Sequence, residues 1–586
     1  MKTTAMLWGA VACVLFAGAV LPAADDGSLP PAARLIPADA LIVIALARPM
    51  DVVDLVLNPK IMAAVAAMPA YAKAAAQPEA VKFFQAVKLI ETNLATGWRP
   101  GLAALAGRGL TLAVTAAGNL VVIDGSDPTM LGRLNETVVN LVKLDAVGKG
   151  APDRVSSRQV HGVAVWSFGP EEAHACIGTR LLLSNRPAML EAALAPRGAS
   201  DAPALADLPA YKEARAAAGA NASGTVFVNL ELLKQNPDVQ QGLMRPQEPL
   251  GALLFSAATE ALKGSRWLAF GIDARGSALS VRAAVDGATA TPEGLAGFTW
   301  PGAAGEGLLP NLAVPRRLAA FSLYRDLARF YRAKDELFPE RTSGIIFFEN
   351  MMGIFFTGRN FADEVLAQTR PETRIVVAAQ AYDEAVGTPA VQIPAFAAVF
   401  RLKDAAKFGI VAEEGWQKAL GLINFTRGQD AQPGLLIDKP VHGGIKFTSA
   451  LFAPPSDGAK EALPLRFNFS PSLACAGDYL IMSSTEGLAR DLIDAVGKER
   501  AAPPAPDAGA NTLLEIDGAG LGSILDANRD NLIRQNMINE GRTREEAEDA
   551  IGFLLGLVRY LDRARLTVTR AGARPEASLE VALSAE

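Results

Sequence analysis

The stretch ACIGTRLLLS at Ala175–Ser184 decides the fold of this chain, because it returns as ACAGDYLIMS at Ala474–Ser483. Cysteine, glycine and serine keep the same order and spacing in both stretches, and a helical pattern follows each one. Both stretches have the apolar content of interior strands. The repeat therefore predicts that the chain consists of two similar copies.

The elements on either side of these stretches also correspond. The fold class predicted from them is α+β, with antiparallel-rich sheets, packed helices and a tandem internal duplication, because strands outnumber βαβ crossovers and hairpins recur. The corresponding pairs are strands at 41–46 and 318–323, strands at 110–114 and 374–378, strand-to-helix turns at 120–128 and 397–404, and hairpins at 267–285 and 565–583.

At 586 residues the chain is too long for one hydrophobic core. Residues 287–310 are rich in glycine and proline and indicate a linker between the copies. Copy 1 is therefore expected at 30–286 and copy 2 at 311–586. A proline-rich tract near 500–510 predicts a subdomain break inside copy 2.

Residues 1–24 have the pattern of a secretory signal peptide. Lys2 precedes an apolar run from Ala5 to Val20, and small residues follow it, so cleavage is expected near Ala23 or Ala24. The alternative is an uncleaved membrane anchor, for which the apolar run is short. We expect an exported protein of the periplasm, the cell envelope or the extracellular space.

The charge balance argues against nucleic acid as a partner. The chain has 56 Lys and Arg against 62 Asp and Glu, a net charge of -6, and its basic residues are scattered along the sequence. Binding to phosphates requires a concentrated basic surface. The partners that remain are an envelope protein or an apolar ligand.

Two cysteines follow the predicted signal peptide, Cys176 and Cys475. An oxidising compartment favours disulfides, so a Cys176–Cys475 bond is one alternative. However, each cysteine occupies the same strand position in its own copy, where a cysteine acts as a small buried hydrophobe. Two separate buried thiols are the favoured interpretation.

Histidines offer little for a metal site, since the chain has only His161, His174 and His442. A zinc site usually combines several histidines and cysteines at short spacings, and none of those spacings occurs here. His161 and His442 each precede glycine and a strand, which is typical of a turn. A metal shared by these two residues is the less favoured alternative, and no cofactor is expected.

Candidate catalytic groups each have a structural explanation. Ser184 and Ser483 stand between a strand and a helix but lack the flanking glycines of a nucleophile turn, so helix capping explains them. Asp127 and Asp404 precede predicted helices and are expected to cap them, while Asp124 ends a strand. The glycines at 518, 520 and 522 lack the spacing of a phosphate-binding loop and predict a turn.

The order of these elements resembles an uncharacterised family of exported bacterial proteins, a domain of unknown function of planctomycete type. The similar segments are Pro37–Val43, Thr357–Gly358 with Asp363–Leu366, Val399–Asp404 and Gly477–Ser484. The resemblance implies export and α+β repeats, and it brings no activity and no site residues.

The sequence therefore predicts a non-enzymatic exported scaffold or binding protein. The alternative is a carrier of lipid or another apolar ligand, which the high content of Ala, Leu and Val permits. A hydrolase that uses Ser184 or Ser483 is a third and less favoured reading. No catalytic, cofactor-binding or metal residue is assigned.

Overall fold

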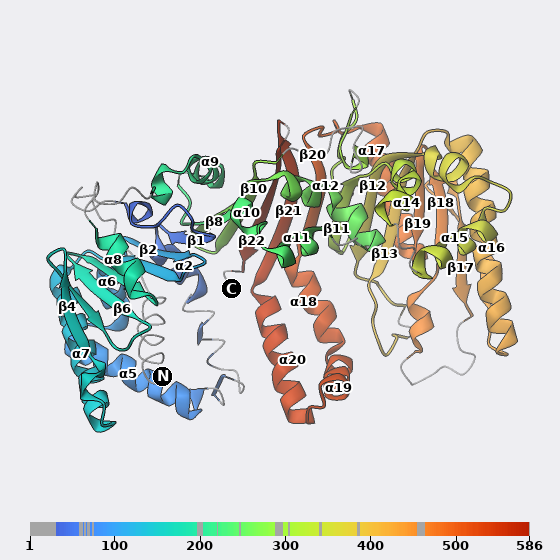
Figure 1. Cartoon of the computed structure of the whole chain (residues 1–586). Coiled ribbons are helices and arrows are strands. Elements are labelled where there is room, and N and C mark those ends of the chain that lie inside the picture. Colours follow the sequence, from blue (N-terminus) through green and yellow to red (C-terminus); the bar gives the residue numbers. More distant parts are fainter. Residues whose placement is uncertain are drawn as a thin grey trace. The chain divides into compact units, whose positions relative to one another are not determined.

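The computed structural model describes residues 31–584 except 58–61, 64–65, 67–70, 73–74, 196–202, 220, 245–247, 288–296, 303–304, 339–342, 384–386, 454–462 and 573. The predicted signal peptide lies outside the described residues. The chain divides into two compact units (Figure 1). Unit 1 comprises Met1–Leu243 and Gly264–Gly287, and unit 2 comprises Met244–Lys263 and Ala288–Glu586.

The described strands of unit 1 form one antiparallel sheet in the order β4-β5-β6-β7-β3-β2-β1-β8-β9-β10. The hairpin of β9 and β10 turns at Gly276, where a positive φ of 58° suits glycine. The strands are β1 (Ile42–Leu46), β2 (Gly109–Val114), β3 (Asn119–Asp124), β4 (Ser156–Val160), β5 (Val163–Ser167), β6 (Ala173–Ile177), β7 (Arg180–Ser184), β8 (Gly224–Asn229), β9 (Trp267–Arg275) and β10 (Ala278–Val285).

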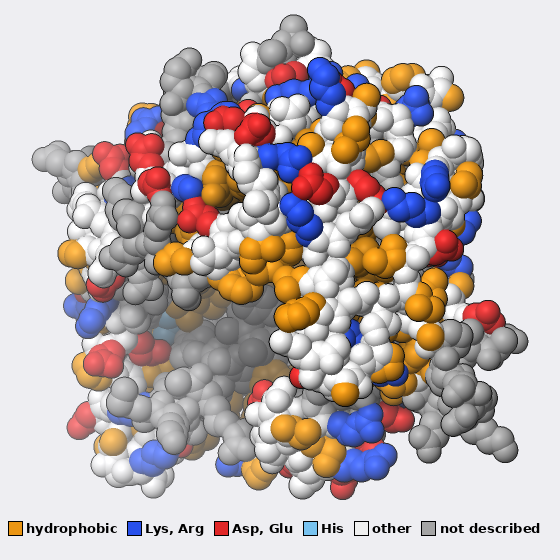
Figure 2. Space-filling view, turned by 90° about the vertical axis from the view of Figure 1, so that its right-hand side faces the viewer, with side chains coloured by type: hydrophobic (Ala, Val, Ile, Leu, Met, Phe, Trp, Pro, Cys, Tyr) orange, Lys and Arg blue, Asp and Glu red, His pale blue; other side chains and the backbone are white. Residues whose placement is uncertain are grey.

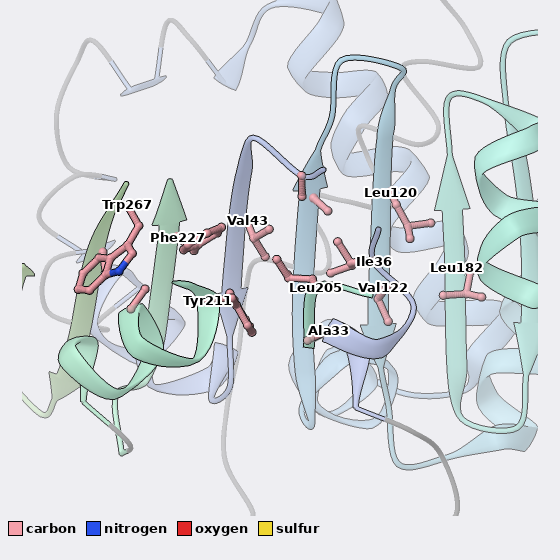
Figure 3. Packing of buried hydrophobic residues seen from close by; sticks show 14 of the residues in the cluster. Ala33, Ile36, Val43, Leu120, Val122, Leu182, Leu205, Tyr211, Phe227 and Trp267 are labelled. Atoms are coloured by element: carbon pink, nitrogen blue, oxygen red, sulfur yellow. The ribbon is translucent and has the colours of Figure 1, made fainter. Parts of the chain in front are cut away.

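Helices cover both faces of this sheet, because successive strand residues point to opposite sides. On one face Leu120 and Val122 of β3 belong to a core that also contains residues of α8 (Pro187–Leu194) and α9 (Pro209–Ala218). Figure 3 shows part of this core, with Tyr211 of α9 over the sheet. On the other face Ile123 packs with the remaining core helices of the unit. These are α2 (Pro49–Val56), α5 (Pro78–Leu94), α6 (Trp98–Ala106) and α7 (Pro128–Gly148). The short helices α10 (Leu230–Leu233) and α11 (Pro237–Met244) follow β8.

The main sheet of unit 2 has the order β14-β17-β18-β19-β13-β12-β11-β20-β21-β22, again antiparallel throughout. A two-stranded ladder of β15 (Val441–His442) and β16 (Ile445–Lys446) lies between β14 and β17 in sequence. The main strands are β11 (Arg317–Tyr324), β12 (Thr369–Ala378), β13 (Ala395–Leu402), β14 (Leu435–Asp438), β17 (Thr448–Phe452), β18 (Ser472–Ala476), β19 (Tyr479–Ser483), β20 (Ala510–Asp517), β21 (Leu561–Ala571) and β22 (Arg574–Leu583).

The two units therefore share one strand order, with β11, β12, β13, β14, β17, β18, β19, β20, β21 and β22 in the places of β1 to β10. The predicted α+β class with antiparallel sheets is confirmed. Common strand order supports the duplication that the sequence predicts. Because β20 pairs with β11, residues on both sides of the tract at 500–510 belong to the same sheet.

Helix α17 (Glu486–Ala501) covers one face of the unit 2 sheet, and α16 (Ala405–Gln429) covers the other. Helices α18 (Gly518–Ala527), α19 (Arg529–Glu540) and α20 (Arg544–Arg559) share a small core of their own and extend from the sheet near β21 (Figure 1). Thr543 and Glu546, three residues apart in the sequence TREE, form a capping box at the start of α20. Unit 2 also contains α12 (Pro249–Gly264), α13 (Leu327–Arg332), α14 (Lys334–Leu337) and α15 (Ser343–Phe355).

The segment Met244–Lys263, expected within copy 1, groups with unit 2. The reason is the buried guanidinium of Arg325, which is 2% exposed. Its Nε donates to the carbonyl of Leu253 at 2.7 Å and its Nη2 to that of Leu254 at 3.0 Å, both in α12. Part of the expected linker is also packed rather than open, since Phe298 and Leu308 are buried in unit 2.

Candidate functional site

An open apolar cavity of about 680 Å³ lies in unit 2 between α16 and the sheet. Strands β13 and β19 form its floor, and the loop around the short helix Leu465–Asn468 closes one side. Its apolar lining includes Phe396, Ala398, Trp416, Ile423, Phe452 and Met482. This volume falls in the range of pockets that hold drug-sized ligands, about 300–1,000 Å³.

The cavity follows from the alternation of side chains along β13. Ala395, Ala397 and Val399 are buried against α17, whereas Phe396 and Ala398 point to the other face, where α16 lies. The N-terminal half of α16 packs closely on that face through Phe408. The helix does not cover the floor completely, and Ala398 has too small a side chain to fill the space that remains.

Apolar side chains of the floor are left in contact with solvent. Phe396 is 49% exposed and Met482 is 37% exposed, although both belong to interior strands of the sheet. Helix α16 lies at the right of Figure 1. Figure 2 views the molecule from that side, and the face it shows has hydrophobic patches between groups of charged side chains. Exposed apolar surface on central strands is uncommon in monomers and marks a binding surface when it is contiguous.

Trp416 of α16 lines the cavity. Its indole Nε1 is buried, with almost no accessible surface, and has no hydrogen-bond partner among the residues that the structure describes. Buried donors are nearly always paired, so this atom is an exception in unit 2, and a ligand in the cavity does not reach it without movement of the ring.

Two arginines lie beside Phe452 at the edge of the cavity. The guanidinium carbon of Arg427 is 4.7 Å from the Phe452 ring centroid, and that of Arg466 is 5.9 Å from it. Arg466 also lies 4.9 Å from the ring of Phe467 and lines the cavity. Stacking on aromatic rings holds both cations near the opening.

The serines of this region are engaged in the protein's own hydrogen bonds. The Ser483 hydroxyl donates to the carbonyl of Thr485 at 2.7 Å, and the Ser484 hydroxyl accepts from the backbone N–H of Phe396 at 2.9 Å. The expected capping role of Ser483 is wrong, because Thr485 caps α17 by accepting from the N–H of Leu488. Ser483 is instead the last residue of β19, and α17 begins at Glu486, two residues later than a cap at Ser483 would require.

Ser184 in unit 1 is likewise not a helix cap. Its hydroxyl donates to the carbonyl of Asn119 at 2.8 Å and accepts from the N–H of Arg186 at 3.1 Å. Helix α8 begins at Pro187, whose residue type is favoured at the first helical position, and it has no side-chain cap. The buried hydroxyl thus joins the ends of β7 and β3.

The histidines occupy three different environments. His161 has a φ of 48° and forms the β4–β5 turn with Gly162, as expected. The same expectation for His442 is wrong, because Gly443 and Gly444 take the positive φ angles and His442 ends β15. The Nε2 atom of His442 lies 2.9 Å from the Asp494 carboxylate. No group of three potential metal ligands occurs among the described residues.

His174 lies in the core of unit 1 and is 1% exposed. Its Nε2 is 3.0 Å from Oδ1 of Asn135, and its ring lies 4.8 Å from that of Phe168. Burial lowers the pKa of His174 from 6.5 to about 4. The imidazole is therefore neutral at physiological pH.

The acidic candidates are structural. Asp127 accepts from the N–H groups of Thr129 and Met130, both at 2.9 Å, and Asp404 accepts from that of Lys407 at 3.1 Å. Both predicted helix caps are confirmed. Asp124 forms an ion pair of 2.5 Å with the buried Arg180 across β3 and β7.

The glycines at 518–522 open helix α18, with Asp517 as its cap, in place of the expected turn. A Cβ on Gly518 would lie 2.0 Å from the carbonyl oxygen of Leu561, so glycine is required there by close packing. Close approach of β21, rather than a phosphate, explains this residue.

Cys176 and Cys475 are both unbonded thiols, each partly buried in its own unit. Burial raises the pKa of Cys176 to about 11. Burial, followed by the negative charge of Glu413, raises the pKa of Cys475. Both groups are protonated and unreactive at neutral pH.

No protein-family model and no curated protein matches the chain. Among solved structures, crystal forms III, I and IV of TP0453 are similar in part, at 10%, 10% and 9% identity. The matches cover 44%, 46% and 44% of this chain and 80%, 82% and 81% of the other, with TM-scores of 0.21, 0.22 and 0.22. TM-scores this low do not establish a shared fold. Among the described residues, no helix combines the length and apolar character needed to cross a membrane.

Proposed function

We propose that this chain is a non-enzymatic exported binding protein, and that unit 2 holds an apolar small molecule in the cavity under α16. The observation that carries the proposal is the solvent-exposed apolar floor of that cavity, where Phe396 and Met482 lie on interior strands. A carrier of apolar ligands is thereby favoured over a scaffold that acts only through its outer surface.

The energetics favour an occupant of this kind. Each ~100 Å² of apolar surface removed from water contributes about 2.5 kcal/mol. A ligand that covers Phe396, Met482 and Ile423 gains this term without a large rearrangement, since the cavity is already formed.

The engaged serines and the capping aspartates support a role without catalysis. Ser184 and Ser483 both use their hydroxyls within the fold, and the Asp127 and Asp404 carboxylates hold helix ends. The pattern of residues 1–24 supports export. Export is tested by sequencing the N-terminus of protein from a cell-envelope fraction, which should begin near Asp25; an intact N-terminus would contradict cleavage.

A neutral fluorescent probe, N-phenyl-1-naphthylamine, tests the cavity directly. We expect saturable fluorescence enhancement with the wild-type protein and loss of most of it in Ala398→Trp, which fills the floor. The matched control is Ile538→Trp on α19, where the original side chain is 80% exposed. Equal enhancement in wild type and Ala398→Trp, or none in the wild type, would refute the proposal.

A further inference from the structure

We infer that the ligand of this cavity is an anionic single-chain amphiphile, whose charged head lies at Arg466 and Arg427 and whose chain lies on the apolar floor. The inference rests on the proposed function and specifies the class of ligand. Its basis is the pair of arginines that stack on Phe452, a residue of the apolar lining, without a carboxylate partner among the described residues.

Neither arginine has a carboxylate partner within the described part of the chain. The Nε of Arg427 donates to the carbonyl of Pro433 at 2.6 Å, and its two terminal nitrogens have no hydrogen-bond partner among the described residues. Within the same part of the chain, the guanidinium of Arg466 has only its contacts with the rings of Phe452 and Phe467. Two cations so close to one ring repel each other, and an anion between them removes that repulsion.

Two other arginines of unit 2 are paired with acids. Arg374 binds Glu499 through two hydrogen bonds, and Arg401 binds Asp478 at 3.0 Å. Arg325 has no acid partner, but its guanidinium is occupied by backbone carbonyls in the core, whereas Arg427 and Arg466 lie beside an apolar lining. That combination complements a molecule with a carboxylate at one end and a hydrocarbon chain at the other.

The cavity offers nothing comparable to a cationic head. No carboxylate lines it among the described residues. Glu413 of α16 already accepts from Thr448 at 2.6 Å, from Gln417 at 2.6 Å and from Lys439 at 2.9 Å. An anionic amphiphile is thus favoured over a cationic or zwitterionic one.

The test compares three probes of one chain length, dodecanoate, 1-dodecanol and dodecyltrimethylammonium, by displacement of N-phenyl-1-naphthylamine at pH 7.5. We expect dodecanoate to bind about tenfold more tightly than dodecanol, which corresponds to about 1.4 kcal/mol, and the ammonium to bind weakest. Raising the salt concentration should reduce the dodecanoate preference alone, because it screens the exposed charges.

The variants locate the head group. Arg427→Gln/Arg466→Gln should abolish the dodecanoate preference while dodecanol and the neutral probe still bind. Arg466→Lys should keep most of the preference, and Lys407→Gln, at the opposite end of α16, should keep all of it. Equal binding of dodecanoate and dodecanol by the wild type, or a preference that survives in the double variant, would overturn the inference about the head group. Either result would leave the proposed function unaffected. Failure of the neutral probe itself would overturn the proposed function.

Discussion

Replacing Glu499 by glutamine should severely destabilise unit 2, because it leaves a buried arginine without its counter-charge. The guanidinium of Arg374 is 2% exposed and donates to the two carboxylate oxygens of Glu499 at 2.5 and 2.9 Å. The hydroxyl of Tyr479 donates to the same carboxylate at 2.5 Å. These contacts join β12, β19 and α17 in the centre of the unit.

The size of the effect follows from burial rather than from the number of contacts. Removal of one partner of a buried ion pair costs about 3–5 kcal/mol, since the remaining charge stays in a medium of low polarity. The exposed pair of Arg544 and Glu548 provides the control: Glu548→Gln should change stability by no more than about 0.5 kcal/mol.

Hydrogen–deuterium exchange with mass spectrometry, read on peptides of β12 and α17, measures unit 2 separately from unit 1. A loss of 3 kcal/mol accelerates exchange of the most protected amides by more than about 100-fold. Burial, followed by the hydrogen bond to Glu499, raises the pKa of Tyr479 to about 12, and that pKa should fall in Glu499→Gln. An exchange rate within tenfold of wild type would refute the reasoning. The reasoning would also be refuted if the double variant Arg374→Met/Glu499→Leu were as unstable as Glu499→Gln, because the double variant leaves no unpaired buried charge.

Three further predictions concern single residues. The pKa of His174 is about 4 in the folded protein against 6.5 for a free imidazole, so the free energy of unfolding should fall by about 3 kcal/mol as the pH drops from 6.5 to 4. Calorimetry at several pH values below neutrality should show this fall in the wild type and not in His174→Gln. Gly518→Ala should lower the free energy of unfolding in urea by about 1–3 kcal/mol, because the new Cβ meets the backbone of Leu561. Gly522→Ala, which has room in the same helix, should be neutral or stabilising. Equal effects of the two substitutions would contradict the packing argument. Cys176, with its pKa raised to about 11, should react with iodoacetamide at pH 8 far more slowly in the folded protein than in urea, and equal rates would contradict its burial.

Local sequence signals identified most of the elements correctly. The aspartates at 127 and 404 and the box at Thr543 mark helix starts because a short polar side chain before a helix satisfies its free N–H groups. The expected strands at 41–46 and 318–323 correspond to β1 and β11. The prediction of which residue caps a helix was wrong where two nearby residues can do so, as with Ser483 and Thr485 before α17.

The candidate site was not predicted from the sequence. Phe396 and Ala398 belong to a continuous apolar strand, which reads as buried on both faces. The cavity exists because α16, which is separated from β13 by only two residues, crosses the sheet so that part of that strand stays uncovered, and the course of a helix over a sheet is not encoded in local spacing. A small alanine beside large aromatic residues was the only local signal, and it has no characteristic spacing.

The sequence by itself determined the α+β class, the helix caps and the similarity of the two halves, since these depend on periodicity and on contacts within a few residues. The tertiary structure decided what matching positions do. Arg48 and Arg325 each lie two residues beyond a matching strand pair, Leu46–Gly224 and Leu323–Thr512. Arg48 binds Asp51 at 2.6 Å at the surface of unit 1, whereas Arg325 is buried and holds carbonyls of α12. Partners distant in sequence set the environment of a side chain, and the same residue type therefore acquires a different role in each unit.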